Sequence, residues 1–253
     1  MTLIAPVLIV VALLAIWEAY ARSGAVDDFI LPAPTEVAQA LADDRALLID
    51  NFWVTASEVG FGIIAALLAG ILLATAIHLS PALRRALYPL LIGSQAVPIV
   101  IVAPLLVVWF GFGVLPKLAI ITLVCFFPVV VTTLDALASV DPEQRKLMRT
   151  LDATRWQEFR WVEIHAALPG ALSGAKIAVA VAVIGAVFAE YSGSSEGLGN
   201  VILQAIPQLE TARAYAAVAL LASFAIALFY LLTLAERLLV PWANRDTEWS
   251  THR

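Results

Sequence analysis

Long apolar segments alternate with short polar ones along the chain, and this alternation predicts the elements of the fold. The apolar segments are continuous and do not alternate with period two, so they predict helices and not the strands of a membrane barrel. A helix that crosses a bilayer needs roughly 20 apolar residues. We expect spans at about Leu3–Tyr20, Ser57–Leu79, Leu87–Phe110, Leu115–Ala138, Leu172–Tyr191 and Ala214–Leu239.

The composition is that of an integral membrane protein. Of the 253 residues, 62% are hydrophobic and 14% are charged, and the mean hydropathy is +0.92. Soluble domains are about 45–50% apolar and about 25% charged. Since a bilayer accepts only helices or closed barrels, we expect an all-α, polytopic membrane protein. We expect one transmembrane domain over residues 1–253, with an additional N-terminal helix in 1–55, a core in 56–240 and a tail in 241–253.

Charge, cysteine content and motifs exclude several other classes. The net charge of -5 offers no basic surface, so no nucleic-acid partner is expected. Cys125 is the only cysteine, which excludes an intrachain disulfide and a thiolate metal cluster. The sequence contains no G-x-x-x-x-G-K-[ST] phosphate loop, no H-E-x-x-H and no nucleophile elbow. We therefore expect no catalytic residue, metal or cofactor, and any ATP hydrolysis belongs to another chain.

The positive side chains set the orientation. They follow the second, fourth and sixth spans, at Arg84 and Arg85, at Arg145, Lys146, Arg149, Arg155 and Arg160, and at Arg237, Arg245 and Arg253. The opposite loops hold only Arg22, Arg45, Lys117 and Arg213. By the positive-inside rule, we expect both termini and the polar segment 141–169 in the cytoplasm of a multi-pass protein of the cell (plasma or inner) membrane.

The loop after the first span predicts a short helix on the outer face. Thr35 is its candidate N-cap, and apolar positions recur at helical spacing over Glu36–Leu48. We expect a connector that lies flat at the interface; a binding role is the alternative. Glu58, at the outer start of the second span, is expected to be a solvated or helix-N-terminal carboxylate.

The polar segment 141–169 has the sequence DPEQRKLMRTLDATRWQEFRWVEIHAALP. Asp141 and Pro142 predict the start of one helix. Asp152 predicts a turn and the cap of a second helix over Ala153–Trp161, and Leu168-Pro169 ends the segment. The result is a helix–turn–helix that lies across the cytoplasmic surface.

Large aromatic and arginine side chains in this segment predict a docking surface. Trp156, Phe159 and Arg160 recur at the spacing that shares one helix face. Trp and Arg dominate interface energetics. The alternative is an amphipathic loop that only anchors in lipid headgroups. The candidate docking residues are Arg149, Leu151, Asp152, Ala153, Thr154, Trp156, Phe159 and Arg160.

A second group of candidates lies inside the spans. Pro98 removes a backbone hydrogen bond from the third span and is expected to kink it. Ser94 and Gln95 precede it, and a polar side chain in an apolar helix prefers the bundle interior. We therefore expect Ser94, Gln95 and Pro98 to line a translocation path. Glu190, at the outer end of the fifth span, is a path or gate candidate because ionisable groups at membrane depth are usually functional; an interfacial carboxylate in water is the alternative.

Five segments carry a resemblance to a known family: VDPE (140–143), MRTLDATRWQEFRWV (148–162), AALPGALSGAKIA (166–178), QAVPIVIVAPLLVVWFGFG (95–113) and AEYSGSSEGLGNVI (189–202). They resemble the ABC-importer permeases of the binding-protein-dependent transport inner-membrane family. The branch they resemble imports sulfonates, taurine, nitrate or pyrimidine precursors of thiamine. The forms LMRTL and PLLVVWFGFG favour the thiamine-precursor branch. The resemblance extends from about Thr55 to Leu239.

Segment 141–169 is similar to the EAA-type cytoplasmic loop of that family, E-A-A-x-x-x-G, nine residues, then I-x-L-P. Lys146-Leu-Met148 stands in the E-A-A place and Asp152 in the glycine place, with Val162 and then Ile164-His165 in the places of I and L-P. The loop departs from the motif at most positions. Lys146 reverses a charge and His165 replaces a helix breaker, whereas Asp152 can enter a left-handed turn at modest cost.

The resemblance implies a permease subunit like those of type I ABC importers, with about six transmembrane helices and a cytoplasmic coupling helix–turn–helix. It implies a cytoplasmic ABC ATPase dimer that grips the loop, an extracytoplasmic solute-binding protein, and a second permease subunit that forms a homodimer within the lipid bilayer. The alternative is a secondary transporter or channel that works without an ATPase, but the internal inverted repeats typical of that class are not visible. A membrane-embedded enzyme lacks a catalytic constellation.

Overall fold

The fold is seen in a computed structural model that describes residues 4–27 and 29–242. These residues form helices and no strand. In chain order the elements are α1 (Ile4–Ala21), α2 (Pro34–Asp43), α3 (Arg45–Leu79), α4 (Pro81–Ser94), α5 (Ile99–Phe110), α6 (Val114–Ala138), α7 (Pro142–Thr150), α8 (Arg155–Glu158), the π-helical turn η1 (Phe159–Glu163), α9 (Ile164–Tyr191), α10 (Leu198–Ala205) and α11 (Thr211–Leu239).

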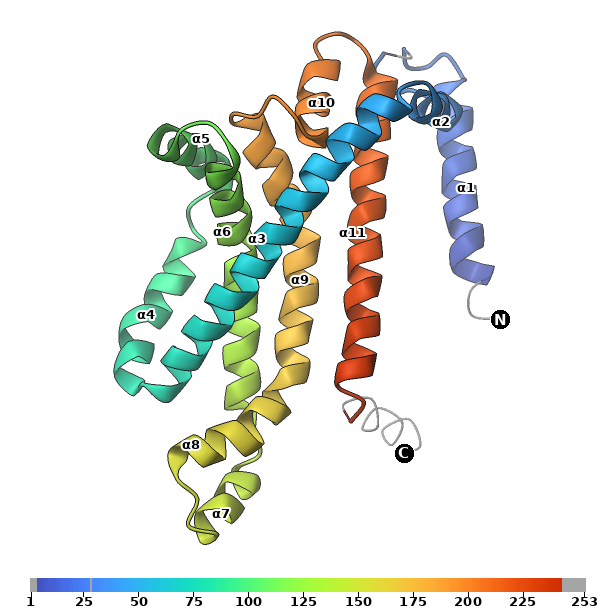
Figure 1. The fold of residues 1–253 in the computed structure, drawn as a ribbon. Helices are drawn as coiled ribbons and strands as arrows, with labels where there is room; N and C mark the ends of the chain where they lie inside the picture. The colour runs from blue at the N-terminus through green and yellow to red at the C-terminus, as the bar shows by residue number, and fades with distance from the viewer. Residues whose placement is uncertain (1–3, 28, 243–253) are drawn as a thin grey trace.

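Helices α3, α6 and α9 form the centre of the bundle, and α11 packs beside them (Figure 1). Their shared core includes Val59 of α3, Ile121 and Val129 of α6, and Ala178 and Ala182 of α9, all of them buried. Alanine and glycine are frequent in this contact, so the helix backbones approach closely. Close backbone approach through small residues is how helices pack inside a bilayer.

A very close approach lies between α6 and α9 at Gly174, where an added Cβ would meet Thr132 Oγ1. Gly174→Val is expected to destabilise the fold by about 2–3 kcal/mol, because the overpacked helices must separate. Thermal unfolding of the purified chain in detergent measures this loss. Gly60→Val is the matched control, since an added Cβ at Gly60 of α3 has nothing within 4 Å. Equal losses in the two variants would contradict the close-packing explanation.

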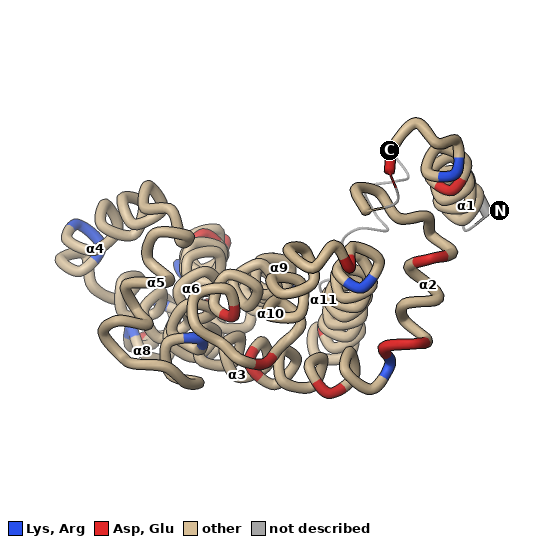
Figure 2. Tube along the Cα trace, turned by 90° about the horizontal axis from the view of Figure 1, so that it is seen from above, with Lys and Arg blue, Asp and Glu red and all other residues tan. Residues whose placement is uncertain are grey.

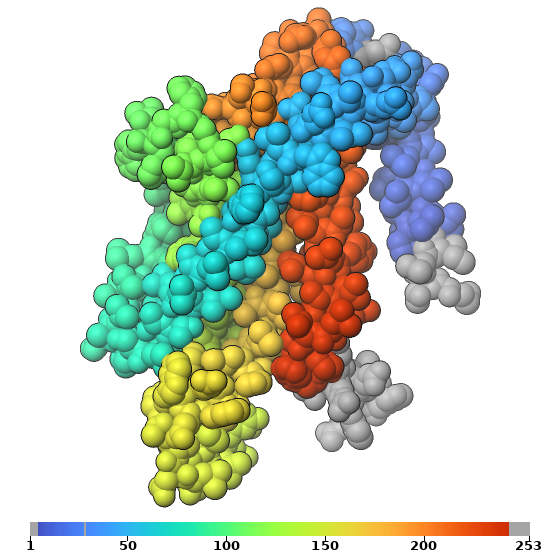
Figure 3. All heavy atoms as spheres, in the orientation of Figure 1, coloured from blue at the N-terminus to red at the C-terminus, as the bar shows by residue number. Residues whose placement is uncertain are grey.

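The two ends of the bundle carry different elements. Helices α2 and α10 lie at one end, with the α5–α6 turn (Figure 1). The α3–α4 turn, α7 and α8 lie at the other end, and α7 and α8 project beyond the neighbouring helices (Figure 3). Arg84 and Arg85 are therefore at the same end as α7 and α8, whereas Lys117 and Arg213 are at the opposite end, as the charge pattern predicted.

The structure contains more helix at the ends of two predicted spans. The second span begins at Arg45 and not at about Ser57. Helices α8, η1 and α9 form one helix over Arg155–Tyr191, so the predicted end of the polar segment at Leu168-Pro169 was wrong. Pro169 is tolerated inside α9, where the adjoining Gly170 packs against Ala136 of α6 and supports the helix.

The short outer helix is present with different limits. It is α2, and its N-cap is Ala33 and not Thr35. Pro34 takes the first helical position, where its missing N–H costs nothing. The Thr35 hydroxyl instead donates to Glu18 Oε1 of α1 (2.9 Å). The predicted continuation to Leu48 is divided at Asp44, after which the chain enters α3.

The third predicted span is broken. Helix α4 ends at Ser94, α5 begins at Ile99, and the two are bent by 103° relative to each other. A kink at Pro98 was expected, but one continuous span over 87–110 was wrong. Pro98 has extended backbone geometry as the N-cap of α5, so the helix stops before it and restarts after it.

Within the part of the chain that the structure describes, four helices are long and apolar enough to cross a membrane: α3, α6, Arg155–Tyr191 and α11. The bent pair α4–α5 passes the same test as a fifth span, and α1 is a shorter apolar helix. Helix α1 stands apart from the bundle (Figure 2), and its apolar side chains are largely exposed. It is attached near its C-terminal end, where the rings of Trp17 and Tyr215 lie 5.9 Å apart. The start predicted at Leu3 lies outside the described residues.

Candidate functional site

The helix–turn–helix predicted for the polar segment is present as α7, a short turn and α8. Asp141 caps α7 and accepts from the Glu143 amide (2.8 Å), as predicted. Asp152 forms the turn with φ +55, in the left-handed region that Asp tolerates better than most residues. Thr154, and not Asp152, caps α8. Its hydroxyl accepts from the Gln157 backbone amide (3.4 Å), and the Gln157 side-chain oxygen accepts from the Thr154 backbone amide.

Two buried carboxylates hold this segment to the bundle. Glu163 is fully buried; its Oε1 lies 2.8 Å from Arg155 Nη1 and 3.1 Å from Arg145 Nε. Its Oε2 lies 2.9 Å from His78 Nε2 at the C-terminal end of α3. Arg145 also donates to the Leu137 carbonyl of α6 (2.7 Å). The network therefore ties α7 and α8 to α3 and α6.

The second carboxylate, Glu158, completes the network. Its oxygens lie 3.2 Å from Arg155 Nη1 and 3.8 Å from Arg149 Nε. Glu158 and Glu163 were not among the predicted site residues, because acidic positions in an amphipathic helix are usually solvated. The signal that could have found them is the spacing of four arginines around two glutamates within residues 145–163.

The outer surface of α7 and α8 is apolar and cationic. Leu147, Leu151 and Trp156 are 61%, 69% and 58% exposed, and the Arg149 side chain is 70% exposed. We call these four side chains the α7–α8 face. Of the other predicted docking residues, Asp152, Thr154 and Arg160 are exposed and Ala153 is half-buried.

Phe159 differs from the prediction. It is buried against Leu137 and Ala167, with its ring 5.6 Å from the ring of Trp156, so it lies beneath the α7–α8 face and supports Trp156 from below. Arg160 does not join this face: its guanidinium lies over the ring of Trp161, 5.9 Å from the centroid. Helical spacing placed Trp156, Phe159 and Arg160 on one face, and the π-helical turn that begins at Phe159 alters that spacing.

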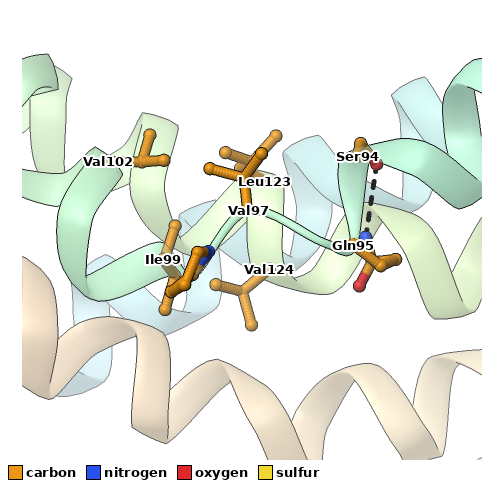
Figure 4. Close-up of a pocket in the computed structure, with 8 residues that line it drawn as sticks. Ser94, Gln95, Val97, Ile99, Val102, Leu123 and Val124 are labelled. Atoms are coloured by element: carbon orange, nitrogen blue, oxygen red, sulfur yellow. Dashed lines mark hydrogen bonds between the residues drawn. The ribbon is translucent and has the colours of Figure 1, made fainter.

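The predicted path residues of the third span lie together at the break between α4 and α5. Ser94, Gln95 and Pro98 line a cavity of about 450 Å³ together with Val97, Ile99, Val102, Leu123 and Val124. Ser94 Oγ donates to the Leu91 carbonyl (2.7 Å), and Gln95 Nε2 donates to Ser94 Oγ (3.4 Å; Figure 4). None of these lining side chains is ionisable, and the polar side-chain groups among them are the Ser94 hydroxyl and the Gln95 amide.

Glu190 lies at the opposite end of the bundle and is fully buried. Its Oε1 accepts from Thr55 Oγ1 of α3 (2.6 Å), and its Oε2 accepts from the Gly199 and Asn200 amides at the start of α10. A carboxylate is favoured there because the first amides of a helix have no intrahelical partner. The alternative prediction, that Glu190 is an interfacial carboxylate in water, was wrong. The contacts of Glu190 join α9, α3 and α10.

A further buried charge lies beside it. Glu58 and Lys117 form an ion pair between α3 and α6, and both residues are more than nine-tenths buried. Lys117 Nζ also donates to Ser194 Oγ in the α9–α10 loop (3.1 Å). The expectation of a solvated Glu58 was therefore wrong. Glu58 and Lys117 are 59 positions apart in the sequence, so no local sequence pattern could predict this ion pair.

Comparisons with known proteins agree on one family. A family model described as "Binding-protein-dependent transport system inner membrane component" matches residues 62–245. The chain is 32% identical to the formylaminopyrimidine transport permease protein ThiX of Halalkalibacterium halodurans over 95% of this chain and 96% of that protein. It is 36% identical to the riboflavin transport system permease protein RibX of Chloroflexus aurantiacus, over 91% and 87%.

Solved structures agree on the fold. The chain matches a chain of the MetNI methionine ABC transporter in an inward-facing conformation with a TM-score of 0.65 at 20% identity, over 79% of this chain and 97% of that chain. This likeness shows the helical architecture of a type I ABC importer permease.

Proposed function

Because the chain belongs to the family of binding-protein-dependent transport system inner membrane components, we propose that it is the permease subunit of an ATP-driven ABC importer. It forms the solute path, and a separate ATPase supplies the energy. The observation that carries this proposal is the α7–α8 face: exposed Trp, Leu and Arg side chains on a projecting helix pair that buried ion pairs hold in place. Exposed side chains of these types, held rigidly, suit a protein partner.

The orientation follows from the distribution of positive charge. The α7–α8 end carries Arg84, Arg85 and the arginines of the polar segment, so this end lies in the cytoplasm together with both termini. The end with α2 and α10 then faces the extracytoplasmic side. A cytoplasmic ATPase dimer docks on the first end, and a solute-binding protein delivers its cargo at the second.

The docking site consists of the α7–α8 face and the residues that support it. Direct contacts come from Arg149, Leu151 and Trp156, with Asp152, Ala153 and Thr154 in the turn and Arg160 at the margin. Phe159 contributes by holding the Trp156 ring from below. Binding of ATP draws the two ATPase subunits together, and the polar segment carries that movement into α6 and α9, to which it is joined covalently.

The solute path runs past the break between α4 and α5. Ser94, Gln95 and Pro98 line it, and a second copy of the chain closes the route in a homodimer, because a single bundle presents this cavity open. Glu190 acts at the outer end of the route by fixing α10, and both of its carboxylate oxygens take part in that attachment.

The cavity favours an uncharged, heteroaromatic solute such as a thiamine pyrimidine precursor over a sulfonate or nitrate. An anion that loses its water in this cavity would find no cation among the lining residues. Burying an unpaired charge costs several kcal/mol of free energy. The relatives named for formylaminopyrimidine and riboflavin are 32% and 36% identical, and those named for aliphatic sulfonates and taurine are 29% and 30% identical, so the preference rests on the lining of the cavity.

The double variant Trp156→Ala with Arg149→Glu tests the docking site. We expect ATPase affinity to fall by at least about 30-fold, since truncating a hot-spot residue costs roughly 2 kcal/mol or more. The measurement is co-purification from membranes followed by titration of the partner. Trp109→Ala is the matched control, because Trp109 is also exposed but lies on α5 near the opposite end.

The outcomes separate the two functional classes. Loss of a P-loop ATPase from the double variant but not from the control supports the importer. If no ATPase co-purifies with the unaltered chain, and the chain alone transports solute in liposomes without ATP, it is a secondary transporter or channel.

A further inference from the structure

Helix α3 links the two ends of the molecule. It runs without a break from Arg45 to Leu79, which makes it roughly 50 Å long. Its inner end reaches the polar segment, and its outer part reaches the start of α10 (Figure 1). Each end of α3 makes specific polar contacts, so α3 can transmit movement from one end of the molecule to the other.

The inner contact is made by His78. Its Nε2 lies 2.9 Å from Glu163 Oε2 and 3.2 Å from Arg155 Nη2. One ring nitrogen cannot satisfy both partners, because the carboxylate needs a donor and the guanidinium needs an acceptor. The shorter contact with the fully buried carboxylate assigns Nε2–H as a donor to Glu163. His78 thereby fastens α3 to the start of α9.

The outer contacts are made by three side chains on α3. Asn51 Oδ1 accepts from the Gly197 amide (2.6 Å), and Thr55 Oγ1 accepts from the Leu198 amide (2.9 Å). Glu58 pairs with Lys117, which itself donates to Ser194. The segment from Ser194 to Leu198 is therefore held by α3, although it is continuous in sequence with α9.

This double attachment has a mechanical consequence. The segment between α9 and α10 is fixed to α9 covalently and to α3 by hydrogen bonds, so sliding of α3 past α9 would shear it. At the inner end, the His78–Glu163 contact opposes such sliding. Movement of α8 passes directly into α9, since α8, η1 and α9 are one continuous helix, whereas α3 has no covalent link to α8.

We propose that α3 is the strut through which movement of α7 and α8 reaches the outer α9–α10 segment, and that His78 is the positioning residue that makes α3 and α9 move together. This inference rests on the proposed ATPase docking at the α7–α8 face. It predicts that His78 is dispensable for ATPase binding and necessary for efficient coupling of ATP hydrolysis to opening of the outer end.

The test uses His78→Ala and His78→Phe in the complex with its ATPase, reconstituted in vesicles. His78→Phe keeps a ring against Phe159, whose ring lies 6.4 Å from that of His78, and so protects folding while it removes the donor. His165→Ala is the matched control, because His165 is exposed at the same end of the bundle. His78→Gln retains an N–H that reaches Glu163 and should restore coupling.

Two readouts are needed: solute transported per ATP hydrolysed, and nucleotide-dependent labelling of Ser195→Cys by a membrane-impermeant thiol reagent. Ser195 is exposed in the outer segment, while the native Cys125 is buried and silent. In His78→Ala and His78→Phe we expect the solute transported per ATP hydrolysed to fall about fivefold, a coupling loss of the usual size. We also expect the effect of ATP on the labelling of Ser195→Cys to disappear. ATPase binding and hydrolysis should persist, because Arg145 and Arg155 still contact Glu163 and hold the α7–α8 face.

The proposal is overturned if His78→Ala and His78→Phe match His165→Ala in both readouts. It is also overturned if they lose the ATPase, because His78 would then only shape the docking surface. If the unaltered chain binds no ATPase, the proposed function fails instead, and that result is visible before any variant is compared.

Discussion

Lys117→Met is expected to destabilise the folded chain by roughly 3–5 kcal/mol, the usual cost of removing one partner from a buried ion pair. Lys117 and Glu58 are both more than nine-tenths buried. Glu58 Oε2 has no hydrogen-bond partner among the described residues, so the charge of this carboxylate depends on Lys117. Methionine keeps the length of the side chain, so the loss measures charge and not packing. Thermal unfolding in detergent should show a fall in Tm of about 10 °C.

Two further variants decide what the loss means. Lys146→Met is the control, since Lys146 is exposed on α7 and should change stability by less than about 0.5 kcal/mol. Adding Glu58→Gln to Lys117→Met removes the stranded charge and should recover more than half of the loss. A stability for Lys117→Met within about 1 kcal/mol of the unaltered chain would mean that water reaches this pair.

The elements of the fold could be predicted from the sequence because each depends on a local signal. Continuous apolar segments indicated six helical segments; in the described residues five of them lie in continuous helices, and the third is divided into α4 and α5. The ends were less accurate because α3 begins at Arg45 and the continuous helix α8–η1–α9 begins at Arg155, both before the apolar stretch, where packing and capping support polar residues in a helix. The hydropathy pattern of the sequence carries no information about such packing and capping.

The break between α4 and α5 was predicted only in part. Pro98 indicated a kink because it removes a backbone hydrogen bond, which is a local property. The angle of 103° depends on where α5 packs, and its contacts with α6 and α9 are tertiary. Ser94, Gln95 and Pro98 were nevertheless predicted as a group, since polar residues beside a proline are adjacent in sequence, and they do line one cavity. Their role in transport stays a prediction.

The polar segment illustrates the same division. The Asp141 cap and the left-handed turn at Asp152 were predicted because both involve neighbours in sequence. The burial of Glu163 was not predicted, because it requires His78, which lies 85 positions away. An acidic residue beside arginines in a helix looks solvated until the helix from which its partner comes is known.

Gly197→Val is expected to cost roughly 4 kcal/mol, the sum of a strained backbone and of the hydrogen bonds that a buried carboxylate loses. Gly197 has φ +106, where a β-branched residue is strongly disfavoured. An added Cβ would also meet the Glu190 carboxylate. The valine would displace Glu190 from the start of α10, and Thr55 and the Gly199 amide would lose their shared acceptor. Thermal unfolding measures the total.

Gly24→Val separates strain from crowding. Gly24 also has positive φ, +73, but an added Cβ there has nothing within 4 Å, so this variant should lose only the backbone part, about 1–3 kcal/mol. If crowding at Glu190 matters, Gly197→Val should in addition raise thiol labelling of Ser195→Cys without ATP and leave ATPase binding intact, because the damage is confined to the outer end. Equal losses in the two variants, with unchanged labelling, would mean that Glu190 does not hold α10, and that Gly197 serves only to turn the chain.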